Sequence, residues 1–100
     1  MRLIFRSFRV VPPVRRRVVV HGRVQGVGFR LAIARAAETR GASGWVRNRA
    51  DGTVEAVFEG PPEIVESLVR FCGTGPRGAA VARVETVEEK PEDLSHFDVR

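Results

Sequence analysis

Glycines and prolines divide this 100-residue chain into short segments that are rich in strand-forming or helix-forming residues. A β-branched run at 18–20 is typical of a buried strand. Residues 29–40 are rich in Ala, Leu and Arg, and Gly41 follows as a helix stop. The pair Asp51-Gly52 predicts a tight turn between two strands. We therefore expect strands at 14–21, 43–48, 53–58, 79–88 and 97–99. We expect helices at 29–40 and 61–71.

The order of these segments is strand–helix–strand–strand–helix–strand, followed by a short fifth strand. Two strand–helix–strand units in this order form a split β-α-β, ferredoxin-like α+β sandwich. We expect a mostly antiparallel sheet of four to five strands, with both helices on one face, which leaves the other face able to face water. Many unrelated functions share this fold, so the function has to be argued from a site.

The positive charge of the chain is concentrated at its N-terminus. The formal net charge is +5, but residues 1–17 contain six arginines and no acidic residue. Residues 18–100 carry 11 basic and 12 acidic side chains, a net charge of −1. We therefore expect residues 1–13 to form a basic extension and residues 14–100 to form a nearly neutral domain.

Composition excludes several classes of protein and site. A single cysteine, Cys72, excludes an internal disulfide framework and a multi-cysteine zinc site. No run of about 18 apolar residues is available for a membrane-spanning helix, so we expect no membrane partner. The aromatic signature of RNA-recognition modules of this fold is missing, so nucleic acid is not an expected partner.

The stretch His21-Gly22-Arg23-Val24-Gln25-Gly26-Val27-Gly28-Phe29-Arg30 lies between a predicted strand and a predicted helix. Glycines at such a turn let several backbone N–H groups point to one spot, and the helix start adds a partial positive charge. An arginine in the first helical turn places a fork of donors over the same spot. Neither the Walker A spacing nor the third glycine of a dinucleotide fingerprint is present. The stretch therefore predicts a site for a phosphate group.

Asn48 ends the predicted strand at 43–48, just before the turn. Its side-chain amide can accept a hydrogen bond from water and donate one to an anion. An uncharged residue that positions water beside a bound phosphate suits hydrolysis, and no carboxylate in either stretch is an obvious general base.

Both stretches resemble the two signatures of the acylphosphatase family, the second being Gly44-Trp45-Val46-Arg47-Asn48 with Gly52-Thr53-Val54 and Gly60. The similarity covers about residues 16–100, and the known fold of the family agrees with the predicted one. The resemblance implies that Arg30 binds the phosphate and that Asn48 holds the attacking water. It also implies a cradle whose backbone N–H groups bind phosphate oxygens. The cradle residues are Gly22, Arg23, Val24, Gln25, Gly26 and Val27.

The resemblance implies an enzyme that hydrolyses small acyl phosphates to a carboxylate and inorganic phosphate by in-line attack of water, with no metal and no cofactor. We expect it to act as a cytoplasmic monomer. The alternative is a module of the same fold that binds carbamoyl phosphate or another phosphate without turning it over. A nucleic-acid binder that uses the basic extension is a third hypothesis, and salt-dependent RNA binding would identify it.

Overall fold

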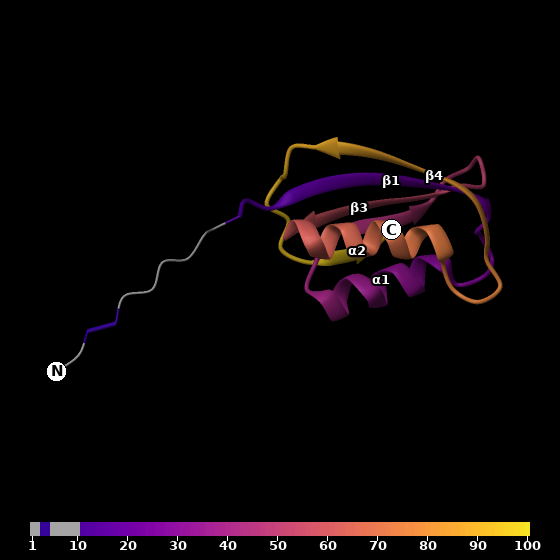
Figure 1. Ribbon diagram of the computed structural model, residues 1–100. Helices are drawn as coiled ribbons and strands as arrows, with labels where there is room; N and C mark the ends of the chain where they lie inside the picture. Colours follow the sequence, from indigo (N-terminus) through magenta and orange to yellow (C-terminus); the bar gives the residue numbers. More distant parts are fainter. Residues whose placement is uncertain (1–2, 5–10) are drawn as a thin grey trace.

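The computed structural model describes residues 3–4 and 11–100, and residues 14–100 form a single open sandwich of a sheet and two helices (Figure 1). The strands are β1 (Val14–Arg23), β2 (Ser43–Asn48), β3 (Val54–Gly60), β4 (Ala80–Glu89) and β5 (Phe97–Val99). The helices are α1 (Phe29–Arg40) and α2 (Pro62–Thr74). In Figure 1 the two helices lie side by side on the same face of the sheet. This arrangement confirms the predicted ferredoxin-like fold.

The sheet has the strand order β4-β1-β3-β2-β5. Strands β1, β3, β2 and β4 pair antiparallel, whereas the short β5 pairs parallel with β2, with Val46 opposite Val99. Strands β1 and β3 are flanked by strands on both sides, which suits the short apolar runs at 18–20 of β1 and 56–58 of β3. The ends of β1 and β2 are thereby brought to the N-terminal end of α1, where the predicted site lies.

The hydrophobic core lies between the helices and the sheet. Alternate residues of the strands face it, and Val18, Val20, Val54, Ala56 and Phe58 are fully buried, as period-two alternation favours. Phe29 and Ile33 of α1 and Leu68 of α2 complete it. The strand residues of this core are Val18, Val20, Val46, Val54, Ala56, Phe58 and Phe97.

The bounds of four elements differ from the sequence-based prediction: β4 is shifted by one residue to Ala80–Glu89, and glycine accounts for two of the other three differences. Strand β1 continues to Arg23 because a bulge between His21 and Gly22 keeps it paired with β4. Helix α2 runs through Gly73 to Thr74 and ends where Gly75 takes a φ of 69°. Strand β3 is shifted to Val54–Gly60.

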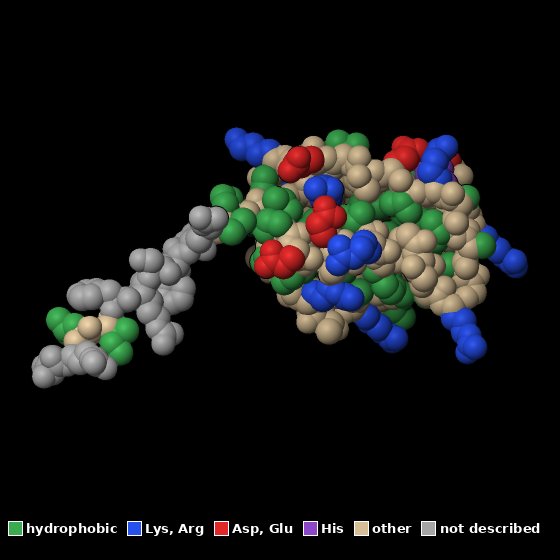
Figure 2. All heavy atoms as spheres, in the orientation of Figure 1, with side chains coloured by type: hydrophobic (Ala, Val, Ile, Leu, Met, Phe, Trp, Pro, Cys, Tyr) green, Lys and Arg blue, Asp and Glu red, His purple; other side chains and the backbone are tan. Residues whose placement is uncertain are grey.

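The face of the sheet away from the helices carries a network of arginines and glutamates. Buried Arg15 donates to Glu59 at 2.7 Å and to Glu89 at 2.9 Å. Arg17 bridges Glu55 at 2.6 Å and Glu89 at 2.8 Å. Opposite charges are thus paired across strands, as cross-strand neighbours favour. The other side of the molecule is also mixed in charge: red and blue side chains lie next to one another around α2 in Figure 2.

The predicted extension, residues 1–13, lies partly outside the described residues. Of its large apolar side chains, Leu3, Ile4 and Val11 are described, and all three are exposed. Among the described residues, no helix has the length and hydropathy needed to span a membrane.

Candidate active site

The loop between β1 and α1, residues 24–28, is shaped by Gly22 near the end of β1 and by Gly28, its own last residue. Gly22 has a φ of 125°, and a Cβ atom there would collide with the backbone of Ala80 on β4. Gly28 lies in the left-handed region at φ 77° and precedes the first residue of α1. Side chains at these two positions would oppose the backbone conformations that shape the loop.

The N-terminus of α1 is open to an anion. No side chain caps it, and its first turn contains no acidic residue. Its first backbone N–H groups therefore have no side-chain acceptor, and the helix dipole places a partial positive charge there. Arg30 is the second residue of this helix and is exposed. The positive end of the helix and the guanidinium of Arg30 belong to the same turn.

The loop is tied to the β2–β3 turn by Gln25. Its Nε2 donates to the carbonyl oxygens of Arg49 at 2.8 Å and Thr53 at 3.0 Å. The turn itself is closed by Asp51, whose Oδ1 accepts from the backbone N–H and the hydroxyl of Thr53. Hydrogen bonds from Thr53 hold the pKa of Asp51 below its usual range. These contacts fix the loop relative to the end of β2, where Asn48 lies.

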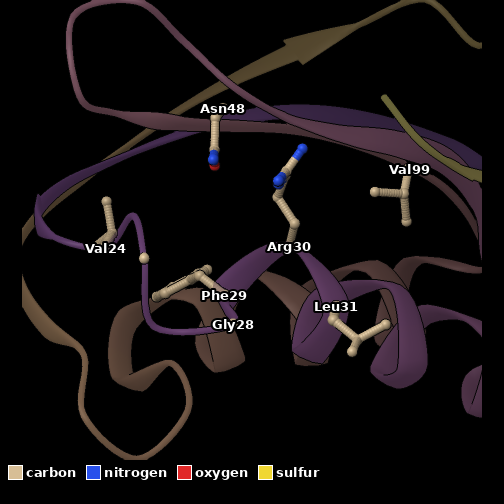
Figure 3. Close-up of a pocket in the computed structure, with 8 residues that line it drawn as sticks. Val24, Gly28, Phe29, Arg30, Leu31, Asn48 and Val99 are labelled. Atoms are coloured by element: carbon tan, nitrogen blue, oxygen red, sulfur yellow. The ribbon is translucent and has the colours of Figure 1, made fainter.

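A cavity of about 250 Å³ lies where the loop, the start of α1 and the end of β2 meet (Figure 3). Arg30 projects from α1 toward Asn48 in this view, and Val24 and Gly28 lie on the loop beside them. Of the predicted site residues, Val24, Gly26, Arg30 and Asn48 line the cavity. The other predicted residues belong to the same loop or its flanks but are not among the lining residues. They are Gly22, Arg23, Gln25 and Val27.

Four residues that line the cavity are outside the set predicted from sequence. They are Gly28, Phe29, Leu31 and Val99. Gly28, Phe29 and Leu31 adjoin Arg30 in the chain, so a wider reading of the same stretch would have included them. Val99 reaches the cavity because β5 pairs with β2. No local sequence pattern specifies that pairing.

Arg30 is held at one nitrogen by the chain beyond β5. Its Nη1 donates to the backbone carbonyl oxygen of Arg100 at 3.2 Å. Arg100 is fixed in turn, because its backbone N–H donates to Val46 at 2.8 Å and its guanidinium lies 4.8 Å from the centroid of the Trp45 ring. An arginine has five N–H donors, so most of those of Arg30 remain available to a ligand.

Among the residues that the structure describes, no carboxylate and no thiol lines the cavity. Burial opposes the ionisation of Glu55, but hydrogen bonds from Arg47 and Arg17 outweigh it and hold its pKa below the usual value. Burial raises the pKa of the Cys72 thiol to about 12, which leaves it protonated and inert near neutral pH. Among the eight described residues that line the cavity, Arg30 is the one charged residue. Three or more His, Cys, Asp or Glu side chains do not gather into a metal-binding group anywhere in the described chain.

The comparisons with known proteins agree with this geometry. A family model described as Acylphosphatase matches residues 16–99. A relative named acylphosphatase from Thermococcus kodakarensis is 54% identical over 86 residues, which span 86% of this chain and 94% of the relative. A solved acylphosphatase structure from Coxiella burnetii is 38% identical with a TM-score of 0.86, covering 89% of this chain and 94% of that one.

A segment of a much larger protein has the same fold. The solved structure of HypF from T. kodakarensis matches at 30% identity with a TM-score of 0.76, and the match covers 87% of this chain but 12% of that chain. The identity is lower than for the free-standing relatives, so the match does not favour the alternative of a non-hydrolytic binding module.

Proposed function

This chain belongs to the acylphosphatase family and hydrolyses acyl phosphates, and from that premise we infer how its residues perform the reaction. Arg30 and the backbone N–H groups of the loop bind the phosphoryl group, and Asn48 positions the attacking water. The observation that supports these roles is one cavity lined by Gly26, Arg30 and Asn48 at the N-terminus of α1.

Binding and neutralising the phosphoryl group is the main task of the site. Helix N-termini and arginine forks both suit phosphate oxygens, and they carry positive charge that favours the extra negative charge of the transition state. We assign this task to Arg30 and to the backbone N–H groups of residues 22–27. In this mechanism Arg30 supplies positive charge beside the phosphoryl oxygens, so we propose that the reaction needs no metal ion.

The chemical step is attack of water on phosphorus, in line with the oxygen that leaves. A bond forms between the water oxygen and phosphorus, and the bond between phosphorus and the acyl oxygen breaks, which releases a carboxylate and inorganic phosphate. Asn48 holds the water by its amide. The cavity-lining residues include no carboxylate or histidine, so a phosphoryl oxygen of the substrate takes the proton of the water. A carboxylate is a good leaving group, and little acid catalysis is needed.

The test is hydrolysis of benzoyl phosphate in EDTA by the wild type, Arg30→Ala and Asn48→Ala. We expect wild-type turnover to persist in EDTA and to fall by about 10²–10³-fold in Arg30→Ala. Asn48→Ala should lower kcat strongly while the inhibition constant for inorganic phosphate changes less than about threefold, because the cradle and Arg30 remain. Arg40→Ala, at the other end of α1, is the matched control and should behave as wild type.

Wild-type turnover lost in EDTA and restored by a divalent cation would contradict the metal-free step. Near-normal turnover in Arg30→Ala or Asn48→Ala would contradict the role given to that residue.

The proposal extends to a cytoplasmic monomer. Arg30 and Asn48, the two residues given chemical roles, line the same cavity within one chain, and this supports a site that works in a monomer. Light scattering during size-exclusion chromatography measures the mass in solution, and cell fractionation measures the location.

A further inference from the structure

The cavity has an apolar side that the phosphate-binding role does not use. Three large hydrophobic side chains within residues 14–100 are more than half exposed: Leu31 at 52%, Val99 at 52% and Val87 at 57%. Leu31 and Val99 both line the cavity, whereas Val87 lies on β4. Apolar side chains that stay exposed next to a binding site indicate that part of the ligand covers them.

The side chains of Leu31 and Val99 come from different elements and lie on the same side of Arg30. Leu31 follows Arg30 in the first turn of α1, and Val99 lies opposite Val46 on β2, the strand that ends at Asn48. In Figure 3 both lie on the side of Arg30 away from Val24 and the loop. A phosphoryl group held by the loop and Arg30 can therefore point its acyl group at this side.

The charges that line the cavity favour an uncharged acyl group. Arg30 is the one charged residue among the eight described lining residues, and in the proposed function the phosphoryl group uses it. A second negative charge on the acyl group would find no further cation among these residues. An apolar acyl group would instead cover Leu31 and Val99 and gain the free energy of removing apolar surface from water.

The size of the cavity agrees with a short acyl group. Its volume of about 250 Å³ is slightly below the roughly 300–1,000 Å³ of typical small-molecule sites. A phosphoryl group, with its five heavy atoms, fills part of that volume and leaves room for a few more atoms.

We propose that Leu31 and Val99 form an acyl-binding surface that gives this enzyme a preference for acyl phosphates with short, uncharged, apolar acyl groups. The inference rests on the proposed function, because it takes the phosphoryl end to be held by Arg30 and the loop.

The test compares acetyl, butyryl and succinyl phosphate as substrates of the wild type and of the double variant Leu31→Gln/Val99→Thr. Both replacements keep the approximate shape and replace apolar atoms with polar ones. Butyryl phosphate has two more methylenes than acetyl phosphate, and each methylene strengthens binding by about fourfold when it is fully buried. Leu31 and Val99 are half exposed, so we count each methylene as about half buried. We therefore expect a kcat/KM for butyryl phosphate at least about fourfold above that for acetyl phosphate. Succinyl phosphate, with its extra carboxylate, should be the poorest substrate. In the double variant the butyryl-to-acetyl ratio should fall to about one, mainly through KM.

Two readouts separate acyl binding from a general loss of the site. The inhibition constant of inorganic phosphate should change less than about twofold in the double variant, because the proposed function assigns phosphate binding to Arg30 and the loop and not to Leu31 or Val99. The matched control is Val87→Thr, which makes the same chemical change at an exposed valine on β4 and should keep the wild-type ratio. Circular dichroism and the single variants check that folding is retained, as expected for exposed positions.

Equal kcat/KM for butyryl and acetyl phosphate in the wild type would overturn the inference, as would a butyryl preference that survives in the double variant. Either result with active hydrolysis of acetyl phosphate leaves the proposed function intact. Absence of acetyl phosphate turnover in the wild type would instead overturn the proposed function, and the acyl-binding surface with it.

Discussion

Single residues carry the proposed chemistry, and few of them are ionisable. Within the described residues that line the cavity, the polar side chains are one guanidinium and one carboxamide. The substrate is already activated, so positioning and charge neutralisation are enough. The residues that hold these groups in place are therefore as important to the rate as the groups themselves, and Gln25 is the clearest of them.

We expect Gln25→Met to lower kcat/KM by about tenfold. The substitution keeps the length of the side chain but removes the donor that binds Arg49 and Thr53, so the loop loses its tether to the end of β2. Two lost hydrogen bonds should lower the free energy of unfolding by about 1–2 kcal/mol. Steady-state kinetics and urea unfolding measure both effects.

The matched control for Gln25 is Ser67→Ala. Ser67 also donates one side-chain hydrogen bond to a backbone carbonyl, that of Ile64 at 2.7 Å, but it lies on α2. It should cost about 1 kcal/mol of stability and leave kcat/KM unchanged. Unchanged kcat/KM in Gln25→Met would show that the tether does not position the loop.

At the scale of elements, the arginine–glutamate network on the face of the sheet away from the helices makes stability depend on pH. Burial opposes the ionisation of Glu59, but the hydrogen bonds it accepts outweigh burial and hold its pKa below the ordinary 4.5. The donors are Arg15 at 2.7 Å and the backbone N–H groups of Glu92 at 2.9 Å and Leu94 at 3.0 Å. The pKa values of Glu55 and Glu89 are also lowered: burial opposes the shift in Glu55, and arginine hydrogen bonds produce it in both.

We expect the free energy of unfolding to fall steeply as pH drops below about 4.5. A carboxylate whose pKa is lowered in the folded state binds its proton more readily when unfolded. Its contribution is therefore complete above the ordinary pKa of 4.5 and is lost as pH falls through the lower folded value. Urea unfolding at a series of pH values measures the slope.

Glu59→Gln tests the cause of that slope. The variant should be less stable by about 1–3 kcal/mol at pH 7, because buried Arg15 loses one of its charged partners and keeps Glu89 at 2.9 Å and Glu92 at 3.7 Å. Its stability should also fall less steeply with acid than that of the wild type. Glu85→Gln is the control, since Glu85 is 53% exposed in its pairs with His21 and Arg83 and should contribute little. Equal acid slopes in Glu59→Gln and the wild type would contradict the assignment.

At the scale of the whole molecule, the sequence predicted the local features and missed the long-range ones. Local signals determined α1, since Gly28 and Gly41 bracket it, and its bounds were predicted correctly. The pair Arg15–Glu59 spans 44 residues, and only the register of β1 against β3 brings it together. The same holds for the residues that line the cavity. The loop and Arg30 were predicted from local sequence, whereas Val99 could not be, because its place depends on the pairing of β5 with β2.

We expect residues 1–13 to be dispensable for folding and for catalysis. Removal of residues 1–13 should leave the Tm and, at 0.15 M salt, kcat/KM unchanged. Strand β1 starts at Val14, and the described residues that line the cavity all lie at Val24 or beyond. Leu3, Ile4 and Val11, which the structure describes within the removed segment, are exposed by 71%, 74% and 56%.

The truncation also removes three arginines and lowers the formal net charge from +5 to +2. Any loss of kcat/KM through weaker attraction of the anionic substrate should therefore be confined to low salt. A full-length variant with Arg2, Arg6 and Arg9 replaced by Gln separates charge from chain and should match the truncation at every salt concentration. A Tm several degrees lower in the truncation alone would instead show that residues 1–13 are part of the folded domain.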